Sequence, residues 1–157
     1  MKTRIRLGRY QDIFHIETLI QELIETAEIP LPPIQRPFIY NVLNYHLPRG
    51  EVMVAIAEEK LAGFSIMAVT PFLWNDESFL ITGFVAMRSI YRNVGLQKDI
   101  IQAMAAHAHS HGTGLILRNI PGIPVGITSD ELAEMGGIID GGSALFLYSP
   151  AMEKADE

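Results

Sequence analysis

The sequence predicts an α/β fold in which a central mixed β-sheet is flanked by helices on both faces. Residues 79–87 form an apolar run of strand length, and helical spacing over 96–112 and a second apolar run over 114–120 follow it. Residues 51–69 form two β-rich runs around the polar break "EEK", a pattern typical of a hairpin. A hairpin-rich first half followed by a β-α-β second half favours a mixed sheet over a purely parallel one.

The first half of the chain begins with a predicted strand over 3–7, where polar and apolar residues alternate. A helix over 12–26 follows, with an apolar stripe at helical spacing and Asp12 placed to cap it. Four prolines within 29–37 predict an ordered loop, because proline cannot continue a helix or donate to a strand ladder. Residues 38–47 suggest a short second helix, and the turn over 71–78 follows the hairpin.

The second half begins with the strand over 79–87, whose nearly continuous apolar character indicates burial on both faces. The helix over 96–112 ends at Gly112, and the strand over 114–120 follows. Ser129 opens a short helix that glycines close, and the last strand covers 143–149. The predicted order is therefore β-α-α-β-β-β-α-β-α-β.

Length and composition restrict the class of protein. The chain has 157 residues, which suits one domain over 1–152 with a loose tail over 153–157. Its net charge of -6 has the wrong sign for a protein that neutralises nucleic-acid phosphates, and no apolar stretch reaches the ~18 residues of a membrane span. We therefore expect a soluble cytoplasmic protein with neither nucleic acid nor membrane as its partner. The absence of cysteine excludes a thiolate metal site and a cysteine nucleophile.

The turn "RSIYRNVG" between the strand over 79–87 and the next helix is a candidate anion site. The first N–H groups of a helix have no internal partner and lie at the positive end of its dipole, so they can hold a phosphate. Gly95 would allow the backbone to approach the ligand, and Arg92 would add donors. Taken alone, Arg-x-x-Gly is a weak pattern that also fits a loop glycine beside a solvated arginine.

The longer segment "MRSIYRNVGLQKDIIQAM" resembles the central motif of the GNAT superfamily of acyl-CoA N-acyltransferases. In that family an apolar strand leads to Arg/Gln-x-x-Gly-x-Gly/Ala at the start of a helix. The resemblance extends over nearly the whole chain, because "RLGRYQDIFHIETLIQEL", residues 51–87 and "ELAEMGG" follow the family's order of elements. Short single-domain GNAT proteins encoded by tailed phages are similar in having a glycine pair before the last strand, as in "DGGSALFLY".

This resemblance implies a fold, a cofactor and a set of binding residues. It implies acetyl-CoA or a related acyl-CoA as co-substrate and transfer of the acyl group directly to an amine in a ternary complex. The backbone of residues 85–87 would lie along the pantetheine arm, and the N–H of Val85 or Met87 would polarise the acyl carbonyl. The backbone amides that would surround the pyrophosphate belong to Arg92, Asn93, Val94, Gly95, Leu96 and Gln97.

Two departures from the family pattern keep a second hypothesis open. Gln97 stands where the family has Gly or Ala, and its side chain could crowd the pyrophosphate or replace a contact. The tyrosine that often protonates the leaving thiolate falls here on Leu132 or Ala133, which cannot donate a proton. The alternative is therefore a non-catalytic GNAT-fold protein that serves as a binding or assembly module. A different α/β nucleotide-binding protein is disfavoured, because the sequence lacks Gly-x-Gly-x-x-Gly and a phosphate-loop lysine.

Two residues are candidates for the general base that accepts the amine proton, namely Glu77 before the buried strand and His46 at the end of the second helix. Each could equally be an ordinary surface residue. The segment "HAHSH" places His107 and His111 on one helical face and His109 on another, so the three cannot share an ion and no metal is expected. The acceptor stays open between a small-molecule and a peptide amine, and strand pairing between subunits could give a homodimer.

Overall fold

The computed structural model describes residues 1–92, 94–119, 127–140 and 143–148, and its centre is a seven-stranded sheet. The strands lie in the order β1-β2-β3-β4-β5-β7-β6. β4 and β5 pair in parallel and the other neighbouring strands are antiparallel, so the predicted mixed sheet is confirmed. The strands are β1 Thr3–Leu7, β2 Val52–Ala57, β3 Lys60–Phe72, β4 Asn75–Met87, β5 Leu115–Arg118, β6 Ile138–Asp140 and β7 Ser143–Phe146.

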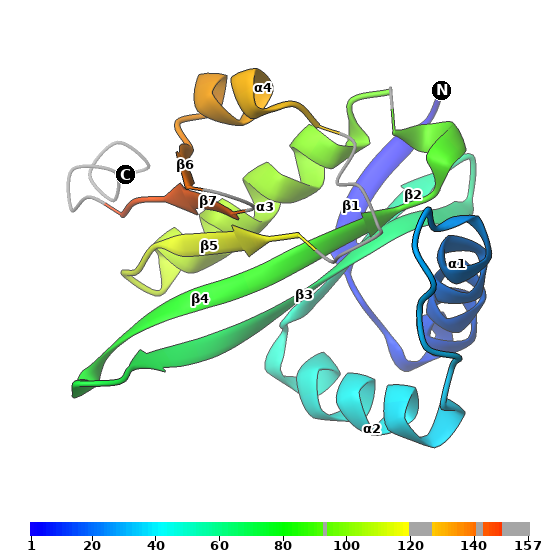
Figure 1. Cartoon of the computed structure of the whole chain (residues 1–157), viewed down its shortest axis with the longest axis horizontal. Helices are drawn as coiled ribbons and strands as arrows, with labels where there is room; N and C mark the ends of the chain where they lie inside the picture. The colour runs from blue at the N-terminus through cyan, green and yellow to red at the C-terminus, as the bar shows by residue number, and fades with distance from the viewer. Residues whose placement is uncertain (93, 120–126, 141–142, 149–157) are drawn as a thin grey trace.

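Helices cover both faces of this sheet, as the sequence predicts (Figure 1). One face carries α1 (Ile13–Thr26) and α2 (Arg36–His46), and the opposite face carries α3 (Leu96–Ser110), with α4 (Ser129–Glu134) tied to α3 by an ion pair between Lys98 and Glu131. Short 3-10 turns η1 (Tyr10–Asp12), η2 (Leu47–Arg49) and η3 (Ser89–Tyr91) connect the elements. In the described part of the chain, no helix combines the length and the apolar character that a membrane crossing requires.

Two hydrophobic cores result, one on each face of the sheet. The α3-side core contains Val85 and Met87 of β4, whereas the α1–α2-side core contains Ala86 and has Phe84 packed against it. This division follows from the alternation of side chains along a strand. β4 therefore contributes to both cores, and its last residues are covered on both faces.

The hairpin of β3 and β4 is longer than the sequence predicts. The segment predicted to be a turn over 71–78 is mostly strand, and only Leu73 and Trp74 separate β3 from β4. The hairpin projects from the body of the sheet (Figure 1), and its first β4 residues are exposed. Burial of β4 on both faces is therefore limited to its second half, because neither helix layer extends over the tip.

α4 begins at Ser129, as the sequence predicts, and Thr128 caps it by accepting a hydrogen bond from the N–H of Glu131. Two other expectations need correction. A short strand, β6, lies between α4 and β7 and is too brief to give a periodic signal. Asp12 does not cap α1 with its side chain; its carboxylate pairs instead with Arg6 of β1 (2.8 Å).

Candidate functional site

The central feature of the site is the point where β4 and β5 separate. The two strands pair only from Ile81 to Gly83 on β4 and from Leu115 to Leu117 on β5. Beyond Gly83, β4 continues to Met87 and pairs with β3 alone. Among the described residues, the remaining length of β4 therefore has one edge without a strand opposite it, as a ligand that adds itself like a strand would require.

The hydrogen bonds of β4 show which backbone groups lie along that open edge. Ile81 N–H donates to Gly114 O on the β5 side (3.1 Å), whereas Arg88 N–H donates to Ala62 O on the β3 side (2.8 Å). Because successive N–H groups of a strand point to opposite edges, the N–H groups of Val85 and Met87 are directed to the open edge. Val85 is only 3% exposed. An N–H that points to an unpaired strand edge can donate to a carbonyl oxygen of a ligand.

The turn that follows β4 leads directly into the N-terminus of α3. Arg92 Nε donates to Met87 O (3.2 Å), which fastens the turn to the end of the strand. Gly95 has a left-handed backbone (φ +85°), and a Cβ built on it would meet no heavy atom within 4 Å. The first helical hydrogen bond runs from Asp99 N–H to Gly95 O (3.2 Å). The N–H groups that precede Asp99, from Leu96 onward, thus have no acceptor within the helix.

The predicted pyrophosphate-binding residues differ in how their side chains lie. Val94 is 43% exposed, whereas the side chains of Leu96 and Gln97 are buried beneath the turn at 1% and 2% exposure. Asn93 lies outside the described residues. Gln97 Nε2 is buried and has no hydrogen-bond partner in the part of the chain that the structure describes. Since the Gln97 side chain is packed inside, the space outside Gly95 is left open.

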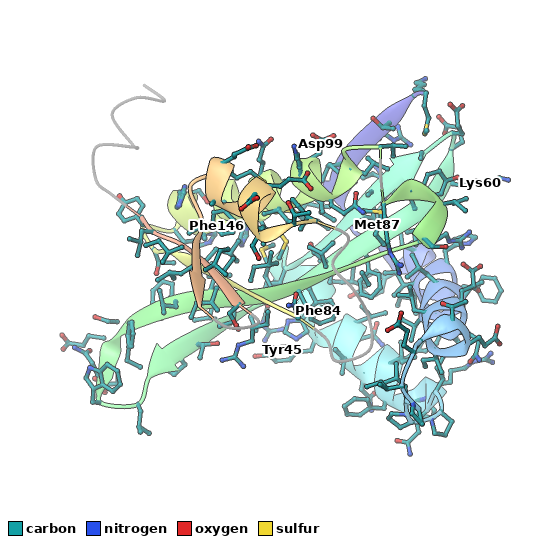
Figure 2. All side chains as sticks on the ribbon, turned by 45° about the horizontal axis from the view of Figure 1, so that its top comes forward. Tyr45, Lys60, Phe84, Met87, Asp99 and Phe146 are labelled. Atoms are coloured by element: carbon teal, nitrogen blue, oxygen red, sulfur yellow. The ribbon has the colours of Figure 1, made fainter. Side chains whose placement is uncertain are left out.

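A cavity of about 430 Å³ lies on the α1–α2 face of the sheet. Its walls come from α1, α2, β3 and β4, and Arg118 at the end of β5 also lines it. Gly83 and Phe84 of β4 belong to its lining, so the cavity reaches β4 where the pairing with β5 stops. Figure 2 labels Phe84 and Met87, whose side chains belong to opposite faces of β4. The cavity and the turn at Gly95 therefore approach the same strand end from opposite faces.

His46 is the cavity residue best suited to accept a proton. Its Nδ1 lies 3.1 Å from Oε1 of Glu51, and both side chains are largely buried, at 15% and 10% exposure. A carboxylate can only accept, so we assign the proton to Nδ1, which leaves Nε2 with a lone pair. Nε2 makes no hydrogen bond to any described residue. Sequence reasoning missed Glu51, although a carboxylate directly before the apolar strand "VMVAIA" was a usable signal.

Glu77, the other candidate base, lies apart from His46. It is an exposed residue near the tip of the β3–β4 hairpin, and its N–H donates to Asn75 Oδ1 (2.9 Å). The six residue steps from Glu77 to Gly83 span roughly 20 Å at the usual rise of a strand. Glu77 does not line the cavity. Of the two candidate bases, only His46 shares the cavity lining with Gly83 and Phe84 of β4.

The remaining sequence candidates lie on the α3 side. The rings of His107 and His111 are 4.6 Å apart, and His109 faces Tyr148 instead (6.0 Å). Burial and the neighbouring His111 lower the pKa of His107, and the nearby Glu51 opposes this shift. Among the described residues, no group of three metal-ligating side chains could hold an ion. On α4, Leu132 packs against the core and Ala133 is exposed, so neither position offers a proton donor.

Neither the family models nor the curated proteins include a match to this sequence. Solved structures do match. A GNAT-family acetyltransferase from Streptococcus pneumoniae is 16% identical, with a TM-score of 0.67 over 94% of this chain and 100% of its own. A GNAT-family acetyltransferase from Brucella melitensis in complex with acetyl-CoA is 13% identical, with a TM-score of 0.65; the match covers 95% of this chain and 90% of that one. A ribosomal-protein-alanine N-acetyltransferase from Brucella melitensis is 16% identical, with a TM-score of 0.69; the match covers 91% of this chain and 96% of that one.

These similarities extend over almost the whole of both chains, and they confirm the fold that the motif and the element order predict. The chain has the GNAT fold. At these levels of identity the likeness establishes the fold and leaves the chemistry to the residues of the site.

Proposed function

We propose that this protein is an acyl-CoA-dependent N-acyltransferase that moves an acetyl group from acetyl-CoA to an amine. The observation that carries the proposal is the open edge of β4 beside the N-terminus of α3. The edge offers backbone donors for an extended polar arm, and the helix terminus suits a pyrophosphate. Acetyl-CoA contains both groups. The presence of acetyl-CoA in a structural neighbour with the same fold supports this assignment.

Different residues of the site would bind different parts of acetyl-CoA. The N–H groups of Gly95, Leu96 and Gln97 would hold the pyrophosphate, with Val94 and Asn93 in the same turn. Arg92 Nε already donates to Met87 O, so the main role of Arg92 would be to hold the turn in place. Its terminal nitrogens have no partner among the described residues. The N–H groups of Val85 and Met87 would bind along the pantetheine arm and the acyl carbonyl.

The chemistry follows from the groups around the end of β4. Acetyl-CoA supplies the acyl group as a thioester. The N–H of Val85 would stabilise the negative charge that develops on the carbonyl oxygen, an effect typically worth 10²–10³-fold in rate. His46 Nε2 would accept the proton that the amine loses as its bond to the acyl carbon forms and the carbon–sulfur bond breaks. Neither Leu132 nor Ala133 can protonate the thiolate, so solvent would supply that proton.

Calorimetric titration with acetyl-CoA tests the cofactor site. We expect saturable binding by the wild-type protein and its loss in Gly95→Val, because a branched residue disfavours the left-handed turn and fills the space outside it. Gly112→Val is the matched control: Gly112 also has a positive φ (+71°) with open space around it, but it lies at the other end of α3.

The two variants separate the binding site from general strain. Both should lose similar stability, and only Gly95→Val should lose the cofactor. Equal binding by wild type and Gly95→Val would refute the proposed turn. No binding by the wild type at millimolar acetyl-CoA would refute acyl transfer and favour the alternative of a non-catalytic binding or assembly module.

A further inference from the structure

The cavity on the α1–α2 face has a composition that restricts which amine can occupy it. Most of its lining is aliphatic or aromatic, and Ile20, Val42, Phe64 and Phe84 are typical members. Its volume of about 430 Å³ is near the lower end of the range for small-molecule sites, which is about 300–1,000 Å³. Such a space suits one compact molecule with an apolar body.

The charges in the lining are equally restrictive. Among the described residues, no carboxylate lines the cavity, and its polar side chains are those of His46, Thr82 and Arg118. The Thr82 hydroxyl is already bonded to Thr70 Oγ1 (3.0 Å). An acceptor with a second ammonium group would have to desolvate that charge with no anion to receive it, which is costly. Polyamines and aminoglycosides are therefore poor candidates.

Arg118 is an exposed residue that supplies a positive charge to the cavity wall, beside the point where β4 and β5 separate. It is the last residue of β5, directly after the residues that pair with β4, and it lines the cavity. Its guanidinium makes no ion pair or hydrogen bond with the described residues. A guanidinium presents donors in a fork that matches a carboxylate.

We propose that the acceptor is an apolar α-amino acid, a proposal that rests on the acyltransferase function above. Its side chain lies in the apolar cavity, its carboxylate pairs with Arg118, and its amine faces His46 and the acyl group. Transfer forms the new carbon–nitrogen bond and breaks the carbon–sulfur bond of the thioester. The amine proton passes to His46 Nε2, and the thiolate leaves to be protonated by solvent. The product is an N-acetyl amino acid, and peptide N-termini are excluded because they lack the adjacent carboxylate.

A matched panel of acceptors tests this specificity by measuring free-thiol release at saturating acetyl-CoA. L-Leucine and L-phenylalanine are compared with isoamylamine and phenethylamine, which have the same apolar bodies without the carboxylate, and with spermidine. We expect kcat/KM for the amino acids to exceed that for the matched amines at least tenfold. Arg118→Gln should raise KM for the amino acids and reduce this preference severalfold. Arg4→Gln is the control, because Arg4 is exposed on β1 and does not line the cavity.

The outcomes separate this proposal from the broader one. Turnover of spermidine or phenethylamine equal to that of the amino acids would overturn the amino-acid proposal and leave acyl transfer standing. If acetyl-CoA binds but no amine releases thiol, binding of L-leucine to the CoA-saturated protein is measured by saturation-transfer NMR. A signal lost in Arg118→Gln supports the proposal, and no signal overturns it. Failure of the wild type to bind acetyl-CoA would remove the acyltransferase function and this proposal together.

Discussion

His46 and Glu51 form the pair of residues on which the proposed proton transfer depends. Substitution of His46 by Gln keeps a polar side chain of moderate size and removes the group that accepts the proton. We expect kcat to fall by about 10²–10³-fold, within the usual contribution of a general base, with little change in acetyl-CoA affinity. Steady-state kinetics and calorimetry on the same sample measure the two effects.

Glu77→Gln provides the control for this substitution. The sequence favours Glu77 as the base ahead of His46, but Glu77 is exposed near the hairpin tip and does not line the cavity. We expect Glu77→Gln to retain wild-type kcat. A loss in Glu77→Gln together with normal turnover by His46→Gln would reverse the assignment of the base.

Gln97 is a buried residue whose Nε2 has no hydrogen-bond partner among the described residues. Gln97 as a whole is 2% exposed, and it lies on α3 among core residues. A buried unsatisfied donor costs roughly 1–3 kcal/mol. Gln97→Met has a similar length and no such donor, so we expect the free energy of unfolding of the ligand-free protein to rise by about 1 kcal/mol. Chemical denaturation measures it, and a decrease would indicate that the amide has a stabilising partner.

At the scale of elements, Asp12 joins β1 to α1. Its carboxylate accepts from both terminal nitrogens of Arg6 (2.8 and 2.9 Å) and from Arg9 N–H (2.8 Å). Burial alone would raise the pKa of Asp12, but the hydrogen bonds from Arg6 and Arg9 outweigh it and lower that pKa. A lowered folded-state pKa means that the ionised form stabilises the fold above the unfolded value of about 3.9, and that this contribution is lost as the pH falls through the lower folded value.

Asp12→Asn should therefore lower the free energy of unfolding by about 2 kcal/mol at neutral pH, because it leaves a largely buried guanidinium without its carboxylate. The difference from wild type should shrink below about pH 4. Glu59→Gln is the control: its pair with Arg4 is long (3.8 Å) and exposed, so it should change stability by less than about 1 kcal/mol. Denaturation across pH checks both, and a difference that grows in acid would contradict the prediction.

The elements also show how far local sequence determines the site. The turn at Gly95 could be predicted because an apolar strand, a glycine and a helix start are adjacent in the chain. The separation of β4 from β5 depends on where Gly83 and Leu117 stop pairing, which is a long-range property of the sheet that no local pattern reports. The pairing of His46 with Glu51 was missed for a different reason: it depends on the side-chain orientations at the end of α2 and the start of β2.

At the scale of the whole molecule, the sheet separates the two spaces to which we assign the cofactor and the acceptor, and both lie beside β4. The turn and α3 lie on one face, and the cavity with His46 and Arg118 lies on the other. The second half of β4 is buried between these two faces, and its residues Gly83 and Phe84 line the cavity. Under the proposed function, a thioester held along the open edge of β4 would be attacked from the cavity side in a ternary complex, with no covalent intermediate on the protein.

The most direct test of this account is an NMR titration of the ¹⁵N-labelled protein with acetyl-CoA, followed at individual backbone amides. We predict that the amides of Val85, Gly95 and Leu96 shift and saturate with a common dissociation constant, because they lie along the open edge and the helix terminus. The amide of Glu77, near the hairpin tip, should not move. Saturable binding that shifts other amides and leaves Val85 and Gly95 unchanged would contradict the proposed site.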